Sequence, residues 1–165
     1  MTEFRLASPL GALILTGDGN ALTALAFADA AAPSAEMPAS PVLRQAAAWL
    51  ETYFAGNIPP EPPPLAPAGT PFQLAVWELL RGIPYGETVS YGAIARELET
   101  LRGGRVAPQA VGQAVGANPI AIMIPCHRVI GAHGGLTGYG GGLERKRQLL
   151  ALETRAVQSK KETSR

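Results

Sequence analysis

The chain has 165 residues, of which 47% are apolar and 16% are charged, a composition typical of a folded globular protein and not of a disordered one. No apolar stretch approaches the ~18 residues that span a bilayer, and the first residues lack the basic and apolar regions of a signal peptide, so we expect a cytoplasmic protein without membrane contact. The net charge is +1, but residues 1–70 carry two basic and six acidic side chains, whereas residues 71–165 carry twelve and seven. This asymmetry suggests that the second half faces a polyanion.

A β-hairpin and one helix are predicted in the first part of the chain. Residues 12–27 contain two apolar runs around the turn sequence Gly-Asp-Gly-Asn, which indicates a hairpin. Ser40 and Pro41 then form the start signal of a helix, and Gly56 is its predicted end. We expect residues 1–57 to form a small N-terminal domain from these elements. The predicted apolar face of the helix consists of Leu43, Ala47, Leu50 and Phe54.

A proline-rich segment separates this region from the rest of the chain. Residues 58–69 hold six prolines among twelve residues, which predicts a stiff, extended linker. A helix then begins at Thr70 with the capping-box pattern Thr-Pro-Phe-Gln. We expect a second domain over residues 70–155 and a disordered basic tail over residues 156–165.

Two short helices within the second domain suggest a helix-turn-helix. Ser90 caps a predicted helix over residues 91–98, and another helix begins at Pro108. The connector between them, residues 99–107, is longer than the ~3–4 residues of an ordinary helix-turn-helix turn, which weakens this interpretation when it is taken alone.

The second helix of this pair has two distinct faces. One is apolar (Val111, Ala114 and Val115), and the other carries Gln109, Gly112, Gln113 and Gly116. Each glycine costs about 1 kcal/mol against alanine inside a helix, so a compensating gain is expected. Two explanations are open: the close approach of another surface, or tight packing against a neighbouring helix.

The only cysteine, Cys126, lies between Pro125 and His127 at the end of an apolar run. A lone cysteine is most often an inert core residue, but a neighbouring base can make it a nucleophile. The run predicts a strand that ends at the proline, so that a turn would bring the thiol and the imidazole into one pocket. Glu153, on the apolar stripe of the last predicted helix, is either the acceptor that orients the histidine or the exposed end of a frayed helix. One cysteine and two histidines are a poor ligand set, so no metal site is expected.

Four blocks of sequence together resemble one family. The blocks are "TPFQLAVWELLRGIPYGETVSYGAIA", "AVGQAVGANP", "IPCHRVIG" and "GLTGYGGGLERKRQLLALE", and they cover residues 70–153. In this order they resemble the O6-alkylguanine-DNA alkyltransferases, also called methylated-DNA–protein-cysteine methyltransferases. The resemblance implies an α+β fold. A small N-terminal domain with an antiparallel sheet and a helix would precede an α-rich domain with a winged helix-turn-helix-like DNA-binding motif and the active-site cysteine.

The family's activity is a single-use repair reaction. The resemblance implies that the protein works as a monomer without a cofactor, binds double-stranded DNA in the minor groove and rotates O6-alkylguanine, chiefly O6-methylguanine, out of the stack. The alkyl group would then pass irreversibly to Cys126. Three other readings remain open: a non-enzymatic lesion-binding relative, which would lack the cysteine, a helix-turn-helix transcriptional regulator, and a Cys-His hydrolase.

The family's motifs also assign roles to single residues of this chain. By resemblance, Cys126 is the alkyl acceptor, His127 takes its proton through a water, and Glu153 orients that histidine. Tyr91 would donate a proton to the departing guanine, and Asn118 would hold the helix against the active-site strand. The glycine-rich loop over residues 131–142 is expected to close on the flipped base. The substrate pocket is predicted to include Pro125, Val129 and Tyr139.

The predicted DNA-binding residues depart from the family pattern at one position. The family carries an arginine that fills the space left by the flipped base, and here that residue is Gln109, beside a connector longer than the family's. Glutamine offers an amide but neither the charge nor the stacking area of arginine. Arg102 or Arg105 on the connector is the alternative candidate for this role. The full predicted set is Arg102, Arg105, Gln109, Ala110, Gly112, Gln113 and Gly116.

Overall fold

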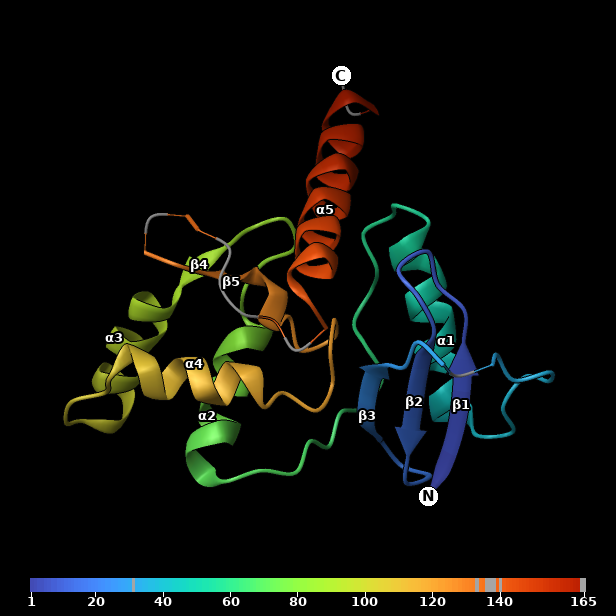
Figure 1. Ribbon diagram of the computed structural model, residues 1–165, viewed down its shortest axis with the longest axis horizontal. Coiled ribbons are helices and arrows are strands. Elements are labelled where there is room, and N and C mark those ends of the chain that lie inside the picture. The colour runs from blue at the N-terminus through green and yellow to red at the C-terminus, as the bar shows by residue number, and fades with distance from the viewer. Residues whose placement is uncertain (31, 133, 136–138, 140, 164–165) are drawn as a thin grey trace. The chain divides into compact units, whose positions relative to one another are not determined.

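The computed structural model describes residues 1–30, 32–132, 134–135, 139 and 141–163 (Figure 1). The chain divides into two compact units that are not two simple halves of the sequence. Among the described residues, no helix has the length and apolar character needed to cross a bilayer. Unit 1 consists of Met1–Pro67, Pro119–Ala121 and Ala151–Arg165, and unit 2 consists of Ala68–Asn118 and Ile122–Leu150.

Unit 1 contains a three-stranded antiparallel sheet. Its strands are β1 (Thr2–Leu6), β2 (Leu13–Gly17) and β3 (Leu22–Phe27), in the order β1-β2-β3. The predicted hairpin is confirmed as β2 and β3, and the Asp18 carboxylate closes its turn by accepting hydrogen bonds from two backbone amides. Strand β1 was not predicted, because only alternate residues of so short a segment face the core.

Helix α1 (Pro41–Phe54) packs against this sheet in unit 1 (Figure 1). It begins as predicted, with the Ser40 side chain accepting a hydrogen bond from the Leu43 amide, and the chain leaves it at Gly56, whose φ is +86°. Most of the predicted face is buried, but Tyr53 takes the buried place expected for Phe54, which is half-buried.

The outer edge of β3 is covered by two other segments of unit 1. The Leu22 amide donates to the Pro64 carbonyl and the Ala66 amide donates to the Leu22 carbonyl, both over 2.8 Å. The Leu25 amide donates to the Pro119 carbonyl and the Ala121 amide donates to the Leu25 carbonyl, both over 2.9 Å. The proline-rich linker is extended, as predicted, but part of it is bound to the sheet.

Unit 2 is built on three helices. These are α2 (Pro71–Arg81), α3 (Tyr91–Arg102) and α4 (Pro108–Gly116). The predicted capping box of α2 is present, and the Ser90 side chain caps α3 as expected. A two-residue strand, β4 (Val89–Ser90), pairs in parallel with β5 (Val129–Ile130).

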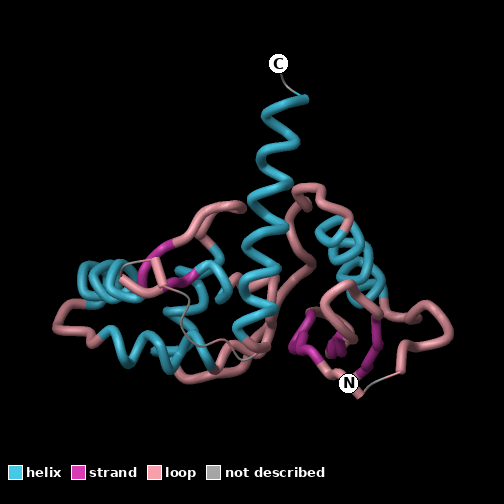
Figure 2. The backbone as a smooth tube through the Cα atoms, turned by 45° about the horizontal axis from the view of Figure 1, so that its top comes forward, coloured by secondary structure: helices cyan, strands magenta, loops and turns pink. Residues whose placement is uncertain are grey.

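Two predicted boundaries were wrong. Helix α3 continues past residue 98 to Arg102, so only residues 103–107 connect it to α4, and Gly103 and Gly104 turn the chain with positive φ angles of 76° and 79°. The predicted disordered tail is helical to Thr163 as part of α5 (Leu143–Thr163), which Figure 2 shows as one continuous helix. No proline or glycine interrupts this segment, and Ala156 is buried on it. Residues 164–165 lie outside the described part.

Candidate active site

Cys126 begins a short 3-10 turn, Cys126–Arg128, rather than following a strand. Pro125 has φ −80° and ψ 65°, the conformation of an inverse γ-turn, and the Cys126 amide donates to the Ile124 carbonyl over 2.7 Å. The predicted strand over the apolar run was therefore wrong: residues 121–124 form turns, and Ile122 has a positive φ of 70°. Such a φ is strained for a β-branched residue. The predicted turn after the run is present.

The Cys126 thiol is buried and hydrogen-bonded. Only 7% of the residue is exposed. Asn118 Nδ2 donates to the Ile124 carbonyl over 2.8 Å and to Cys126 Sγ over 3.1 Å. Burial raises the pKa of the Cys126 thiol above its ordinary value, while the Asn118 hydrogen bond and the positive charge of Lys146 lower it.

Lys146 is a site residue that the sequence analysis missed. It is 0% exposed, and its Nζ donates to the Val129 carbonyl over 2.6 Å. Burial lowers the pKa of Lys146, and the nearby Cys126 raises it, so the charges of the two groups are coupled. Its position seven residues before Glu153 places it on the apolar stripe of α5, a signal that could have singled it out from its neighbours Arg145 and Arg147.

The two residues after Cys126 are also buried. His127 is 0% exposed and Arg128 is buried. Arg128 Nη1 donates to the Ile83 carbonyl over 2.8 Å, and its guanidinium lies 5.4 Å from the centre of the Tyr85 ring. Arg128 thereby fixes the 3-10 turn to the end of α2. No group of three potential metal-binding side chains occurs among the residues that the structure describes.

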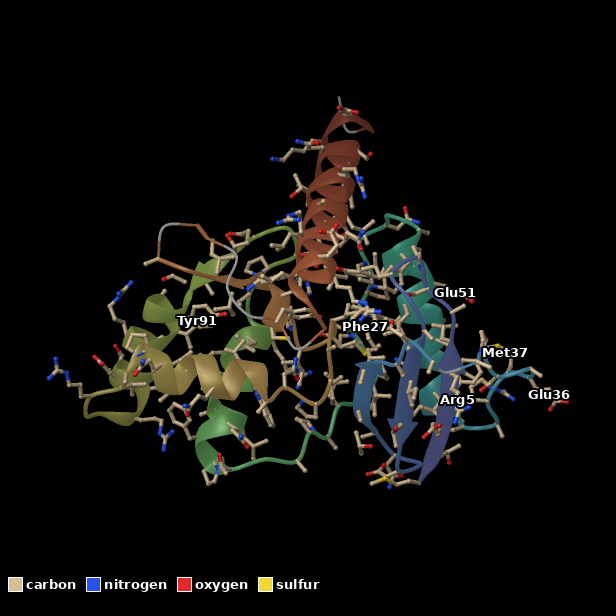
Figure 3. All side chains as sticks on the ribbon, in the orientation of Figure 1. Arg5, Phe27, Glu36, Met37, Glu51 and Tyr91 are labelled. Atoms are coloured by element: carbon tan, nitrogen blue, oxygen red, sulfur yellow. The ribbon has the colours of Figure 1, made fainter. Side chains whose placement is uncertain are left out.

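Two tyrosines belong to the surroundings of Lys146 and Cys126. Tyr91 is the first residue of α3 (Figure 3), and the centre of its ring is 6.0 Å from Lys146 Nζ. The Tyr139 hydroxyl is buried, and burial together with the charge of Cys126 raises the pKa of that phenol. Within the predicted closing loop, residues 133, 136–138 and 140 lie outside the described residues, and Tyr139 is the one described residue within 136–140.

Glu153 lies in unit 1, where its carboxylate is 1% exposed and accepts a hydrogen bond of 2.7 Å from the Tyr53 hydroxyl. The reading of Glu153 as the exposed end of a frayed helix was therefore wrong. The predicted pocket residue Val129 is fully buried in β5, where it is paired with Val89 of β4. Val129 interacts with Lys146 through its backbone carbonyl, which accepts the hydrogen bond from Lys146 Nζ.

Helix α4 has the two faces that its sequence predicts. Its apolar residues are buried, whereas Gln109, Gln113 and Gly116 are exposed and Ala110 and Gly112 are half-exposed. A Cβ added at Gly112 would make ordinary contact with the Tyr91 ring at 3.9 Å, and one added at Gly116 would have no atom within 4 Å. Tight internal packing therefore does not explain the two glycines.

Arg102, the last residue of α3, and Arg105, on the connector before α4, are both exposed. The Arg102 guanidinium lies 5.5 Å from the centre of the Phe72 ring. The Glu99 carboxylate accepts a hydrogen bond of 3.0 Å from the Val106 amide and so fixes the loop. Arg105 is exposed on this fixed loop, next to the start of α4.

A buried thiol with charge-coupled neighbours and a helix pair whose second helix exposes glycines are the features expected of a DNA-binding protein with a nucleophilic cysteine. Residues 71–155 match the family model "6-O-methylguanine DNA methyltransferase, DNA binding domain", and residues 4–61 match "6-O-methylguanine DNA methyltransferase, ribonuclease-like domain". The chain belongs to the methylated-DNA–protein-cysteine methyltransferase family.

Individual relatives agree with this assignment. The methylated-DNA–protein-cysteine methyltransferase of Mycobacterium leprae is 47% identical, with 91% of this chain and 90% of the relative covered. The methylated-DNA–protein-cysteine methyltransferase of Methanosarcina acetivorans is also 47% identical, with 88% of this chain and 94% of the relative covered. Among solved structures, the Mycobacterium tuberculosis O6-methylguanine methyltransferase has a TM-score of 0.79 at 45% identity, and Mycobacterium tuberculosis OGT in complex with DNA has a TM-score of 0.80 at 47% identity. Each of these two matches covers 92% of this chain and 92% of the solved structure. The resemblance stated from the sequence blocks and the α+β fold class are confirmed.

Proposed function

We propose that the protein repairs double-stranded DNA by transferring the alkyl group of O6-alkylguanine, chiefly O6-methylguanine, to Sγ of Cys126, once per molecule. The observation that carries this proposal is the buried Cys126 thiol, hydrogen-bonded by Asn118 and coupled to the charge of Lys146, in a chain of this family. The protein acts in the cytoplasm as a monomer and uses no cofactor.

The reaction begins with removal of the thiol proton. Because burial raises the pKa of Cys126, a base must take the proton, and His127 is the adjacent imidazole. Glu153 orients that imidazole and favours its charged form. The thiolate attacks the alkyl carbon, so that an S–C bond forms as the C–O6 bond breaks and the electron pair remains on guanine.

The departing guanine takes up a proton as its negative charge develops. Tyr91 is the donor, and a donor aimed at developing charge lowers the barrier of such a step. Lys146, 6.0 Å from the Tyr91 ring, adds positive charge to the same region. The product is a thioether, which these groups cannot hydrolyse, so each molecule reacts once.

DNA is bound through the exposed face of α4. The damaged base must leave the stack to reach a buried thiol, at a cost of a few kcal/mol. The glycines of α4 allow the backbone to approach the minor groove, whose degenerate pattern suits a protein that must work in any sequence. Gln109 occupies the position of the family's inserted arginine, and Arg105, exposed on its fixed loop, supplies the positive charge beside it.

The proposed function is tested by the stoichiometry of transfer. Duplex DNA with a radiolabelled methyl group on O6 of one guanine is incubated with the protein at several molar ratios. We expect label to move to protein until one methyl group per molecule is bound, and then to stop. Binding to the damaged duplex without transfer would instead identify a lesion-binding protein, and continued turnover would identify a different enzyme.

The variant Glu153→Gln should slow methyl transfer about tenfold, because an amide cannot supply the charge that favours a protonated histidine. DNA affinity should be unchanged. The measurement is the single-turnover rate constant at saturating duplex, with the dissociation constant measured separately. The neighbouring exposed residue provides a control in Thr154→Ala. A wild-type rate constant in Glu153→Gln would mean that Glu153 serves only the fold.

The variant Gly116→Ala should separate stability from DNA binding. Gly116 is the last residue of α4, where alanine is favoured over glycine by less than the about 1 kcal/mol of a helix interior, and no atom within 4 Å opposes the new Cβ, so the melting temperature should rise slightly. The same methyl group would stand between α4 and the minor groove, and affinity for duplex DNA should fall about fivefold or more. The control is Thr100→Ala, a helix-favouring change in α3. Unchanged DNA affinity in Gly116→Ala would show that this end of α4 does not approach DNA.

A further inference from the structure

The Tyr53–Glu153 hydrogen bond joins two residues one hundred positions apart in the chain. Tyr53 lies in the last turn of α1, and Glu153 lies on α5 within the same unit. The donor and acceptor atoms are 2.7 Å apart, and both residues are almost completely buried. A short hydrogen bond to a carboxylate in such surroundings is among the stronger kinds in proteins.

The Tyr53 ring is held in one position. It stacks on Trp49 with ring centres 5.5 Å apart and planes 9° apart, and it meets Phe54 edge-on at 5.3 Å. The Tyr53 residue is 0% exposed. A ring packed in this way cannot turn its hydroxyl away from the carboxylate without disturbing the core of the unit.

We propose that Tyr53 is a positioning residue for alkyl transfer and acts by fixing the Glu153 carboxylate. The proposal rests on the proposed function, in which Glu153 orients His127. Tyr53 donates to Oε2 and thereby restrains the orientation of the Glu153 carboxylate. Tyr53 does not touch the substrate.

A neutral donor suits this task better than a cation. Lysine or arginine at the same place would offset the carboxylate charge that favours a protonated histidine. A neutral phenol donates its hydrogen bond and leaves the negative charge in place. Tyrosine therefore restrains the geometry of Glu153 while preserving its electrostatic effect.

The test is the variant Tyr53→Phe, which keeps the ring and removes only the hydroxyl. We expect the single-turnover rate constant for methyl transfer to fall about fivefold to tenfold, the size expected for one hydrogen bond to a charged group. The dissociation constant for duplex DNA should not change. Rates are measured well below the melting temperature of each variant, so that loss of folded protein does not enter.

The control is Trp49→Phe. Trp49 belongs to the same aromatic cluster, but its Nε1 donates to the Pro60 carbonyl over 2.8 Å and not to Glu153. This variant loses a part-buried hydrogen bond between neutral groups and keeps a ring against Tyr53. We expect a comparable loss in melting temperature and a wild-type rate constant for transfer.

A double-mutant cycle separates positioning from a general structural effect. If Tyr53 acts through Glu153, adding Tyr53→Phe to Glu153→Gln should slow transfer no further. Equal slowing in both backgrounds, or an unchanged rate constant in Tyr53→Phe alone, would overturn the proposal. Failure of the proposed function itself would be seen differently, because the wild-type protein would then take up no methyl group.

Discussion

Replacement of Cys126 by alanine should abolish methyl transfer completely while leaving DNA binding intact. The thiolate is the only group in the mechanism that forms a bond to the alkyl carbon, and Cys126 is the only cysteine in the sequence. Alanine fits the space of the buried thiol without a new polar group. In the wild-type protein, intact mass should rise by one methyl group after incubation with methylated duplex, and the alanine variant should show no change.

DNA binding by the Cys126→Ala variant is the control for its loss of methyl transfer. Cys126→Ala should bind duplex containing O6-methylguanine with near-native affinity in a gel-shift assay, because the exposed face of α4 is unaltered. The Asn118 amide loses the thiol as a partner but keeps its 2.8 Å hydrogen bond to the Ile124 carbonyl. Transfer of label to the alanine variant at any other side chain would refute the assignment of Cys126 as acceptor.

Replacement of Lys146 by methionine should slow methyl transfer by one to two orders of magnitude. The Lys146 charge lowers the pKa of the Cys126 thiol against the effect of burial. Without this charge the pKa of the thiol rises further, and each unit of that rise leaves about tenfold less thiolate at pH 7. The Val129 carbonyl also loses its donor, which should cost about 1–3 kcal/mol of stability.

The sign of the pH dependence distinguishes a loss of thiolate from a loss of protein stability. The rate of transfer should recover in Lys146→Met as pH rises toward the increased pKa of the thiol, whereas lost stability would not be restored in this way. The measurement is the rate constant between neutral and alkaline pH for the wild-type protein and the variant. Lys160→Met, on the exposed part of the same helix, is the matched control. A parallel pH profile in wild-type and Lys146→Met proteins would show that Lys146 does not act on the thiol.

Local signals in the sequence predicted the helix starts well. Ser40, Thr70 and Ser90 each accept the hydrogen bond expected of an N-cap, because capping depends on residues only three positions apart. The buried face of α4 also followed from its spacing alone. The ends of the helices were predicted less well. Helix α3 continues to Arg102 because no residue in its sequence ends the helix before the glycines that follow.

The predictions that failed concern features that depend on contacts between residues distant in sequence. The apolar run before Cys126 favours a strand by composition, yet only Ile120 pairs, in a single bridge with Leu25, and the chain then turns at Ile122 with a positive φ. Lys146 stands between Arg145, which is half-buried, and Arg147, which is exposed, and composition alone does not single out the buried cation. The role of Tyr53 required the partner on α5 to be known.

The covered edge of β3 has a consequence for how this protein can be divided. Its partners are residues 64–66 and 119–121, and unit 1 also contains the helical residues from Ala151 onward. A fragment ending at Pro67 would expose the backbone groups of Leu25 at a sheet edge, which favours intermolecular pairing and aggregation. It would also lack the acceptor of the buried Tyr53 hydroxyl. The amino-terminal region is therefore not an exchangeable module, and gene fusions or permutations that separate it from the later segments would lose an intact fold.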